Sequence, residues 1–139
     1  MKSYEKPNLI LPVSLHDARL NNIEIENTII TFIMEDGIRT ISGRDVEQTG
    51  KAKVTFPKVD FDFCKVYCTG KDNYRKEWNI DDFATKLYIK KPKPIIDIID
   101  ETYGYNQAKF SCNLTMNDEW FDCEIEIYHF EPMKYVWNE

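Results

Sequence analysis

Apolar and polar residues alternate along much of the chain, which is the pattern of β-strands with one buried and one exposed face. Isoleucines alternate with acidic residues over 22–26, and the alternation returns over 51–56. Pro57 follows the second run and lacks a backbone N–H, so we expect that strand to end there or to lie at a sheet edge. Four further strand-like runs follow towards the C-terminus, at 95–103, 107–115, 121–130 and 133–137.

Between the first two runs, the sequence predicts a hairpin. Residues 28–34 are β-branched and apolar, and the segment 35–37 (Glu-Asp-Gly) supplies residue types that tolerate a tight turn. We expect residues 38–42 to form the returning strand. The polar segments 43–50 and 71–77 are expected to be loops.

The apolar phase changes by one residue between positions 59 and 68. Apolar residues occupy the odd positions 59, 61 and 63, and then the even positions 64, 66 and 68. A β-bulge produces such a change, because one extra residue reverses the face that later side chains take. We therefore expect a bulge near Phe63–Lys65.

Apolar residues recur at intervals of three and four between residues 80 and 87, which predicts a short helix. Asn79 or Asp81 supplies its N-cap, and the prolines at 92 and 94 end the run. No flexible linker or repeat divides the chain, so we expect a single domain over 1–139. The predicted fold class is mainly β, α+β at most: one antiparallel sheet, or a sandwich or half-barrel, with one short helix near residues 80–90.

Composition adds an acidic surface to this picture. The 139 residues are 42% hydrophobic and 14% aromatic, which is too apolar for intrinsic disorder. The net charge of −6 argues against a nucleic-acid partner, since domains that bind nucleic acids are usually basic. Residues 51–93 carry 11 basic and 6 acidic side chains, whereas residues 94–139 carry 2 basic and 10 acidic ones. This asymmetry indicates a surface region specialised for association.

The sequence also bears on location. No apolar run is long enough to span a bilayer, and residues 1–7 lack the apolar core of a secretion signal. We therefore expect a cytoplasmic protein that does not bind a membrane. In that compartment the four cysteines, at 64, 68, 112 and 123, are expected to be free thiols.

The chain carries no signature of an enzyme, a metal centre or a nucleotide site. No local motif joins a cysteine to one of the two histidines as nucleophile and base. Cys64 and Cys68 lie four residues apart in a strand-like run, about 13 Å, which is too far to share a zinc ion. The 5 glycines form no phosphate-binding loop, and the basic cluster at 90–93 is more simply a solvated loop than a phosphate contact. We expect no catalytic residue, no metal and no cofactor.

Two histidines are the candidates for a pocket. His129 continues the apolar face of the 121–130 run, where a hydrogen-bonded core histidine is more common than a catalytic one. Asp17 either orients the imidazole of His16 or stabilises a turn, and we favour the turn. If the β layer encloses a ligand pocket, we expect His16, Asp17 and His129 to line it.

The clearest functional pattern is acidic. Asp122, Glu124, Glu126 and Tyr128 fall on one face of a predicted strand whose other face is apolar. One interpretation is that the acids keep the strand soluble and block edge-to-edge pairing. The other is a charge-steered protein interface, because aromatic residues at 103, 105, 120, 135 and 137 are expected near the acids. Under the interface hypothesis the partner-binding residues are Asp118, Glu119, Trp120, Asp122, Glu124, Glu126 and Tyr128.

The segment 14–20 (Ser-Leu-His-Asp-Ala-Arg-Leu), followed by short strands and the Asp36-Gly37 hairpin, resembles the beginning of small β-rich immunity proteins of bacterial polymorphic and contact-dependent toxin systems. The run from 95–99 to 135–137 is similar in layout, so the resemblance spans most of the chain. It implies a non-enzymatic cytoplasmic antitoxin that binds and blocks a cognate toxin domain, frequently a nuclease with a basic active site. The alternatives are a small-ligand-binding or enzymatic β domain, and a structural subunit with an apolar interface.

Overall fold

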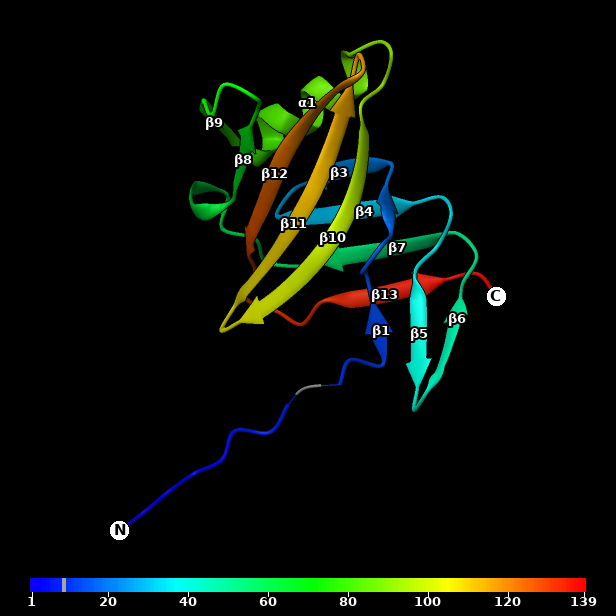
Figure 1. Cartoon of the computed structure of the whole chain (residues 1–139), viewed down its shortest axis with the longest axis vertical. Helices are drawn as coiled ribbons and strands as arrows, with labels where there is room; N and C mark the ends of the chain where they lie inside the picture. Colours follow the sequence, from blue (N-terminus) through cyan, green and yellow to red (C-terminus); the bar gives the residue numbers. More distant parts are fainter. Residues whose placement is uncertain (9) are drawn as a thin grey trace.

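Antiparallel strands form three open sheets in the part of the chain that the computed structural model describes, residues 1–8 and 10–139 without the side chain of Tyr88. The largest sheet has six strands in the order β2-β10-β11-β12-β8-β9 (Figure 1). Their bounds are Arg19–Leu20 for β2, Ile95–Gly104 for β10, Gln107–Met116 for β11, Glu119–Tyr128 for β12, Lys65–Thr69 for β8 and Arg75–Asn79 for β9. The long strands β10, β11 and β12 form its centre, and they correspond to the predicted strand-like runs at 95–103, 107–115 and 121–130.

The other two sheets are smaller. A four-stranded sheet has the order β13-β7-β4-β3, and a three-stranded sheet has the order β1-β5-β6. The bounds of the first are Lys134–Trp137 for β13, Ala52–Phe56 for β7, Ile29–Met34 for β4 and Asn22–Glu26 for β3. Those of the second are Val13–Ser14 for β1, Arg39–Ser42 for β5 and Asp45–Gln48 for β6. The β5-β6 hairpin projects from the body of the molecule (Figure 1).

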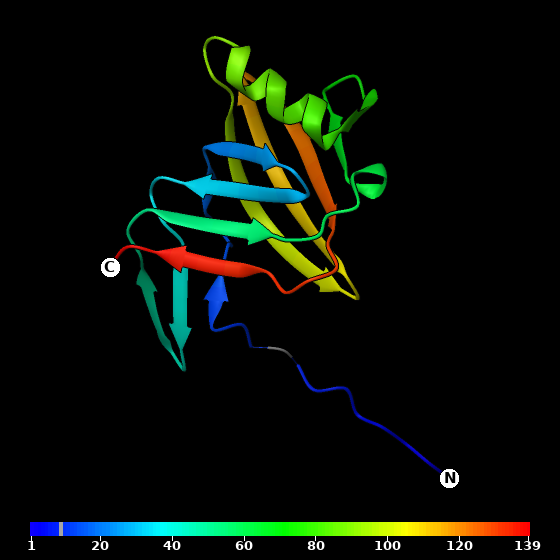
Figure 2. The same ribbon diagram turned by 180° about the vertical axis from the view of Figure 1, so that it is seen from behind.

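The four-stranded sheet packs face to face against part of the six-stranded sheet (Figure 2). Phe32 on β4, Phe56 on β7 and Phe110 on β11 are fully buried between them. The ring centroids of Phe32 and Phe56 are 4.9 Å apart, and those of Phe32 and Phe110 are 5.3 Å apart, both edge to face. The mainly β, antiparallel fold predicted from the sequence is confirmed, in a sandwich-like arrangement.

The helix α1, Ile80–Ile89, covers the remaining end of the same inner face (Figure 2). Its buried residues are those with helical spacing in the sequence: Ile80, Phe83, Ala84 and Leu87. Asn79 occupies the N-cap position, and Asp81 and Asp82 lie in the first turn, where negative charge is favourable at a helix N-terminus. The predicted helix is therefore confirmed. We refer to the face of the six-stranded sheet turned away from α1 as the outer face.

The predicted hairpin around Gly37 is wrong. β4 pairs with β3 and β7, whereas the strand at 39–42 pairs with β1 and β6. Gly37, with φ 87°, turns the chain out of the four-stranded sheet rather than back along it. The segment 43–50, expected to be a loop, contains β6, whose four residues are all exposed. β6 is a strand because its backbone pairs with β5. It buries no side chain, so the sequence carries no apolar pattern that would reveal it.

The predicted bulge near Phe63–Lys65 is also wrong. Phe61–Phe63 form a short 3-10 helix, η1, in which the backbone N–H of Asp62 donates to the side chain of Asp60 at 3.2 Å. This turn changes the apolar phase before β8 begins. The irregularity in strand pairing lies instead between Ile98 and Asp100 of β10. The segment 71–77 is a loop in its first half and then enters the edge strand β9, while β7 ends at Phe56 as Pro57 predicted.

Candidate functional site

The acidic strand β12 lies inside the six-stranded sheet, with β11 on one side and β8 on the other (Figure 1). Every residue from 119 to 128 has a cross-strand partner on β11. From Asp122 to Glu126 the strand is also paired with β8, so Asp122, Glu124 and Glu126 do not lie at a sheet edge and do not serve to block edge-to-edge pairing. Cys123, Ile125 and Ile127 are buried, which places the alternate residues of the strand on the outer face.

Each outward acid of β12 has a polar or aromatic residue directly opposite on both neighbouring strands. The sets are Asp122 with Asn113 and Thr69, Glu124 with Ser111 and Tyr67, and Glu126 with Lys109 and Lys65. Part of this surface is hollowed into an open cavity of about 630 Å³. We call it the outer-face groove, defined by Tyr67, Arg75, Ile99, Asn113, Asp122 and Glu124.

Negative charge dominates the outer-face groove. The guanidinium carbon of Arg75 lies 4.0 Å from the ring centroid of Tyr67, so this cation is stacked on the phenol. Burial raises the pKa of Tyr67, and the carboxylates of Glu126 and Glu77 raise it further.

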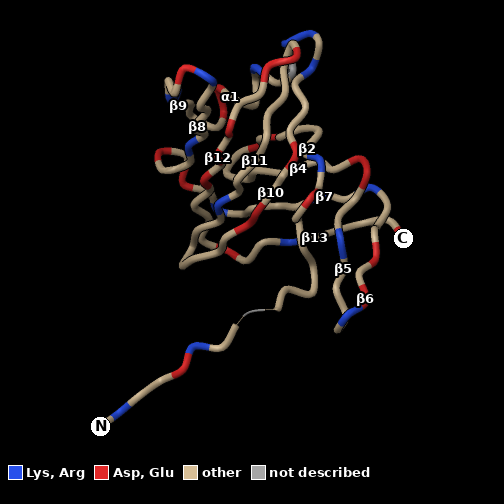
Figure 3. The backbone as a smooth tube through the Cα atoms, in the orientation of Figure 1, with Lys and Arg blue, Asp and Glu red and all other residues tan. Residues whose placement is uncertain are grey.

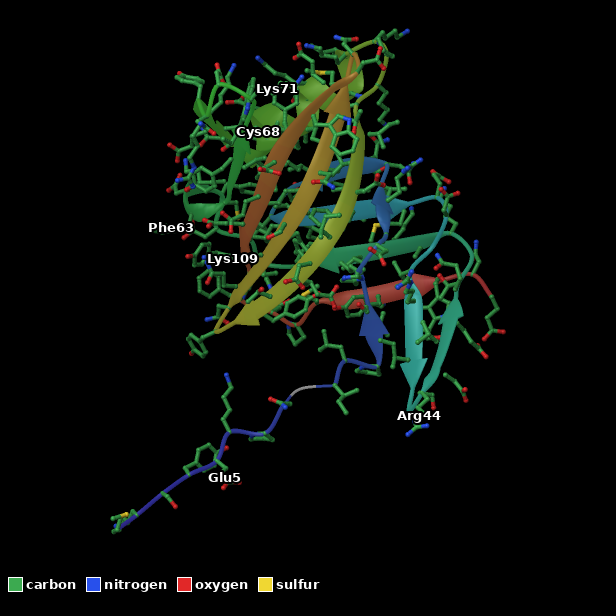
Figure 4. All side chains as sticks on the ribbon, in the orientation of Figure 1. Glu5, Arg44, Phe63, Cys68, Lys71 and Lys109 are labelled. Atoms are coloured by element: carbon green, nitrogen blue, oxygen red, sulfur yellow. The ribbon has the colours of Figure 1, made fainter. Side chains whose placement is uncertain are left out.

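The outward residues of β12 differ in how free they are to meet a partner. Glu126 forms a 3.5 Å ion pair with Lys109, and its side chain is 17% exposed. The Tyr128 hydroxyl accepts a 2.7 Å hydrogen bond from Gln107, and the Tyr128 ring lies against Phe63. Phe63 and Lys109 are both labelled in Figure 4. Among the described residues, no ion pair engages Asp122 or Glu124. These two acids are the ones most available for association.

The predicted residues 118–120 lie at the tip of the β11-β12 hairpin, at the end of the sheet near α1 (Figure 1). Asn117 and Asp118 have φ of 52° and 64°, the positive values of a tight hairpin turn. Trp120 is 68% exposed and lies opposite Thr115 on the outer face. Glu119 is exposed on the other face of the strand. Asp118 and Trp120 thus extend the acidic surface to its tip.

Most of the other aromatics expected near the acids are not there. Tyr103, Tyr135 and Trp137 pack against the hydrophobic core. The hydroxyl of Tyr135 donates a 3.4 Å hydrogen bond to that of Tyr103. Tyr105 is 95% exposed in the turn between β10 and β11. Among the described residues, Trp120, Tyr67 and Tyr128 share the outer face with the acids, and Tyr128 is partly buried.

The two histidines lie in different settings, and neither lines the outer-face groove. His16 Nδ1 is 3.0 Å from Asp17 Oδ2, which also lies 3.2 Å from Arg39. Asp17 has φ 64° and its N–H donates to the carbonyl of Ile98 at 2.8 Å, which confirms the predicted turn. The His129 ring packs edge to face on Phe56, and its Nδ1 is 2.8 Å from the carbonyl oxygen of Glu131.

The four cysteines are free thiols. Three of them are direct cross-strand neighbours, Cys68 on β8, Cys123 on β12 and Cys112 on β11, and the sulfurs of Cys68 and Cys123 are 3.6 Å apart. Burial raises the pKa of Cys64 to about 11 and that of Cys112 to about 12, so both are unreactive at neutral pH. Within the described residues, no group of three or more His, Cys, Asp and Glu side chains is placed to hold a metal ion.

The chain matches no family model, no curated protein and no solved structure at a significant level. In the described ranges, no helix is long and apolar enough to cross a membrane. Any function therefore has to be argued from the chain's own residues.

The sequence predicted the acids of β12 but missed the other four residues that define the outer-face groove. Tyr67, Arg75, Ile99 and Asn113 come from four other strands, β8, β9, β10 and β11. The alternation of 65–69 carried a usable signal, because buried Val66 places its two neighbours on the exposed face. Nothing in one strand's pattern indicates which other strand lies beside it, so the groove itself was not predictable.

Proposed function

We propose that this protein is a non-enzymatic immunity protein that neutralises a basic, nuclease-type toxin domain by binding it through the outer face of its six-stranded sheet. The binding surface is the outer-face groove together with the hairpin tip at Asp118 and Trp120, whereas Glu119 lies on the other face of the strand and is not part of it. The proposal includes a cytoplasmic location and needs no cofactor. The kind of surface is argued from the residues, and the kind of partner from the resemblance of segment 14–20 to immunity proteins.

The observation that carries the proposal is the setting of Asp122 and Glu124. Both side chains lie on the outer face of β12, in the stretch Asp122–Glu126 that is paired on both sides, and no ion pair engages either one among the described residues. Like charges two residues apart on one strand face repel, so their presence costs stability. A cationic partner relieves that repulsion and is attracted over long distance, which speeds its association.

Apolar and aromatic groups accompany the acids, as a stable interface requires. Trp120 is 68% exposed and Ile99 is 40% exposed on the same sheet. Exposed tryptophan supplies large contact area at low entropic cost, and such residues dominate binding energy when a partner covers them. β11 pairs with every residue of β12 and with every residue of β10 except Ile99, so the backbone of this surface is formed before the partner arrives.

The experiment that tests the proposal is capture of the tagged protein from its native cells while a toxin domain encoded beside it is produced. Three baits are compared: the wild type, the double variant Asp122→Lys/Glu124→Lys, and the double variant Glu24→Lys/Glu26→Lys. Glu24 and Glu26 are exposed acids with the same two-residue spacing on β3 of the other sheet, so the control changes the net charge equally. Thermal unfolding of each bait verifies that the fold is intact.

We expect the wild type and the β3 control to capture a basic toxin domain and to protect cells from it, and the β12 variant to lose both properties. Equal capture by all three baits would remove the outer face from the interface. Absence of the toxin domain from the wild-type capture, with the domain present in the cells, would overturn the proposed function.

A further inference from the structure

A second groove, of about 390 Å³, lies between α1 and the inner face of the six-stranded sheet, so the sheet separates it from the outer-face groove. Figure 2 shows α1 lying across the end of the six-stranded sheet, and both α1 and the sheet strands contribute residues to the groove. We call it the inner groove. Its apolar walls are Trp78, Phe83, Leu87, Leu114, Met116 and Phe121.

Three lysines, Lys76, Lys86 and Lys90, border the inner groove. The ammonium nitrogens of Lys76 and Lys86 lie 4.0 and 4.1 Å from the ring centroid of Trp78. Among the described residues, none of the three lysines forms an ion pair with a carboxylate. Asp72 also lines the groove, and its Oδ1 accepts a 3.1 Å hydrogen bond from the N–H of Tyr74. An apolar space with excess positive charge thus exists in a chain whose net charge is −6.

This charge belongs to a wider basic region. The loop between α1 and β10 carries Lys90, Lys91 and Lys93 and contributes Lys90 and Pro94 to the groove, whereas acidic positions recur along β12 (Figure 3). Each ammonium group carries three N–H donors and no acceptor, and contact with an indole face leaves donors free for an anion. The groove therefore offers an anion several ammonium donors beside the apolar wall formed by Trp78 and α1.

We propose that the inner groove binds a small anionic amphiphile, a carboxylate carried on an aliphatic body. Lys76 and Lys86 hold the carboxylate, and the body packs between Trp78 and the apolar residues of α1. The cavity is near the lower end of the ~300–1,000 Å³ range of small-molecule sites, which fits a short-chain ligand rather than a protein segment. The site lies on the other side of the sheet from the proposed toxin-binding surface and does not depend on it.

Cys68 provides a reporter inside the inner groove. Cys68, labelled in Figure 4, lines the groove and is partly exposed, whereas Cys64, Cys112 and Cys123 are buried. The contact with Cys123 lowers the pKa of the Cys68 thiol, and Lys76 lowers it further. Neutral N-ethylmaleimide should therefore modify Cys68 before the other thiols in the folded protein.

The test uses octanoate and its uncharged counterpart octanamide as probes, with affinity measured by calorimetry and Cys68 modification followed by mass spectrometry. We expect octanoate to bind, to bind at least about tenfold more tightly than octanamide, and to slow the modification of Cys68. The variant Lys76→Gln/Lys86→Gln should weaken octanoate binding by about tenfold or more, because both stems remain and both charges are removed.

The matched control is Lys53→Gln/Lys134→Gln, which removes two exposed lysines from the four-stranded sheet. It should bind octanoate as the wild type does. Any one of three results would overturn the proposal: no octanoate binding at millimolar concentration, equal affinity for the two probes, or equal affinity of the Lys76/Lys86 variant and the control. If the wild-type protein binds octanoate but captures no toxin domain, that result would count against the proposed function alone.

Discussion

Phe110 links the two packed sheets, so shortening its side chain tests whether they share one core. The residue is fully buried, and its ring centroid lies 5.3 Å from Phe32, 5.9 Å from Phe56 and 6.1 Å from Tyr103. Truncating a buried phenylalanine to alanine lowers the free energy of unfolding by ~3–5 kcal/mol. We expect a value near the upper end of this range, because Phe110→Ala also removes edge-to-face contacts with other rings. We expect Phe110→Ala to lower the free energy of unfolding by about 4–5 kcal/mol. That is a large part of the ~5–15 kcal/mol typical of a whole domain.

Because such a variant is close to unfolding, Phe110→Leu is the more informative change. It keeps most of the volume but removes the ring contacts, and we expect a loss of about 1–2 kcal/mol. Urea unfolding followed by circular dichroism measures both variants. Trp120→Ala serves as the control, since this exposed side chain should change the free energy of unfolding by less than about 0.5 kcal/mol. A Phe110→Leu variant as stable as the wild type would refute the packing of β11 against β4 and β7.

Two further changes test local features of the fold. Gly37→Ala should lower the free energy of unfolding by about 2–3 kcal/mol, because φ is 87° and a Cβ would lie 2.2 Å from the carbonyl oxygen of Thr49. Gly43→Ala should lower it by only about 1 kcal/mol, because Gly43 has φ 61° but a Cβ there would meet no other atom. Equal losses in urea unfolding would contradict the close approach at Gly37. Burial raises the pKa of the Glu101 carboxyl group above its ordinary value of 4.5. The folded state therefore keeps the proton of this carboxyl group to a higher pH than the unfolded state does. The stability of the wild type relative to Glu101→Gln should therefore fall as pH rises above about 4.5, and a difference that stays constant from pH 4 to 7 would contradict this.

Strands and the helix with strong periodicity were predictable, because burial of one face leaves its period in the sequence. The runs at 95–103 and 107–115 and the helix at 80–89 are of this kind. β6 was missed because all four of its residues are exposed, so backbone pairing alone defines it. The pairing of β5 with β1 and β6 was missed for a related reason: the pattern of a strand shows its buried face but not its neighbour.

The candidate site was predictable to the same extent. Alternation placed Asp122 and Glu124 on one exposed face, which the buried Cys123 and Ile125 confirm. Whether those acids lay at an edge or in the middle of a sheet depended on long-range pairing with β8, which is 55 residues away at Cys68. The inner groove was not predicted at all, because Lys76, Lys86 and Trp78 meet only when α1 packs on the sheet.

The most direct test of the proposed function is the association rate of the captured toxin domain, measured over a range of salt concentrations. The account predicts that Asp122→Lys/Glu124→Lys binds about tenfold or more slowly than the wild type at low salt, with a shallower dependence on salt. Glu24→Lys/Glu26→Lys, which has the same net charge as the β12 variant, should slow association much less. Association of the β12 variant at the wild-type rate, with the same salt dependence, would contradict the acidic outer face as the surface that meets the toxin.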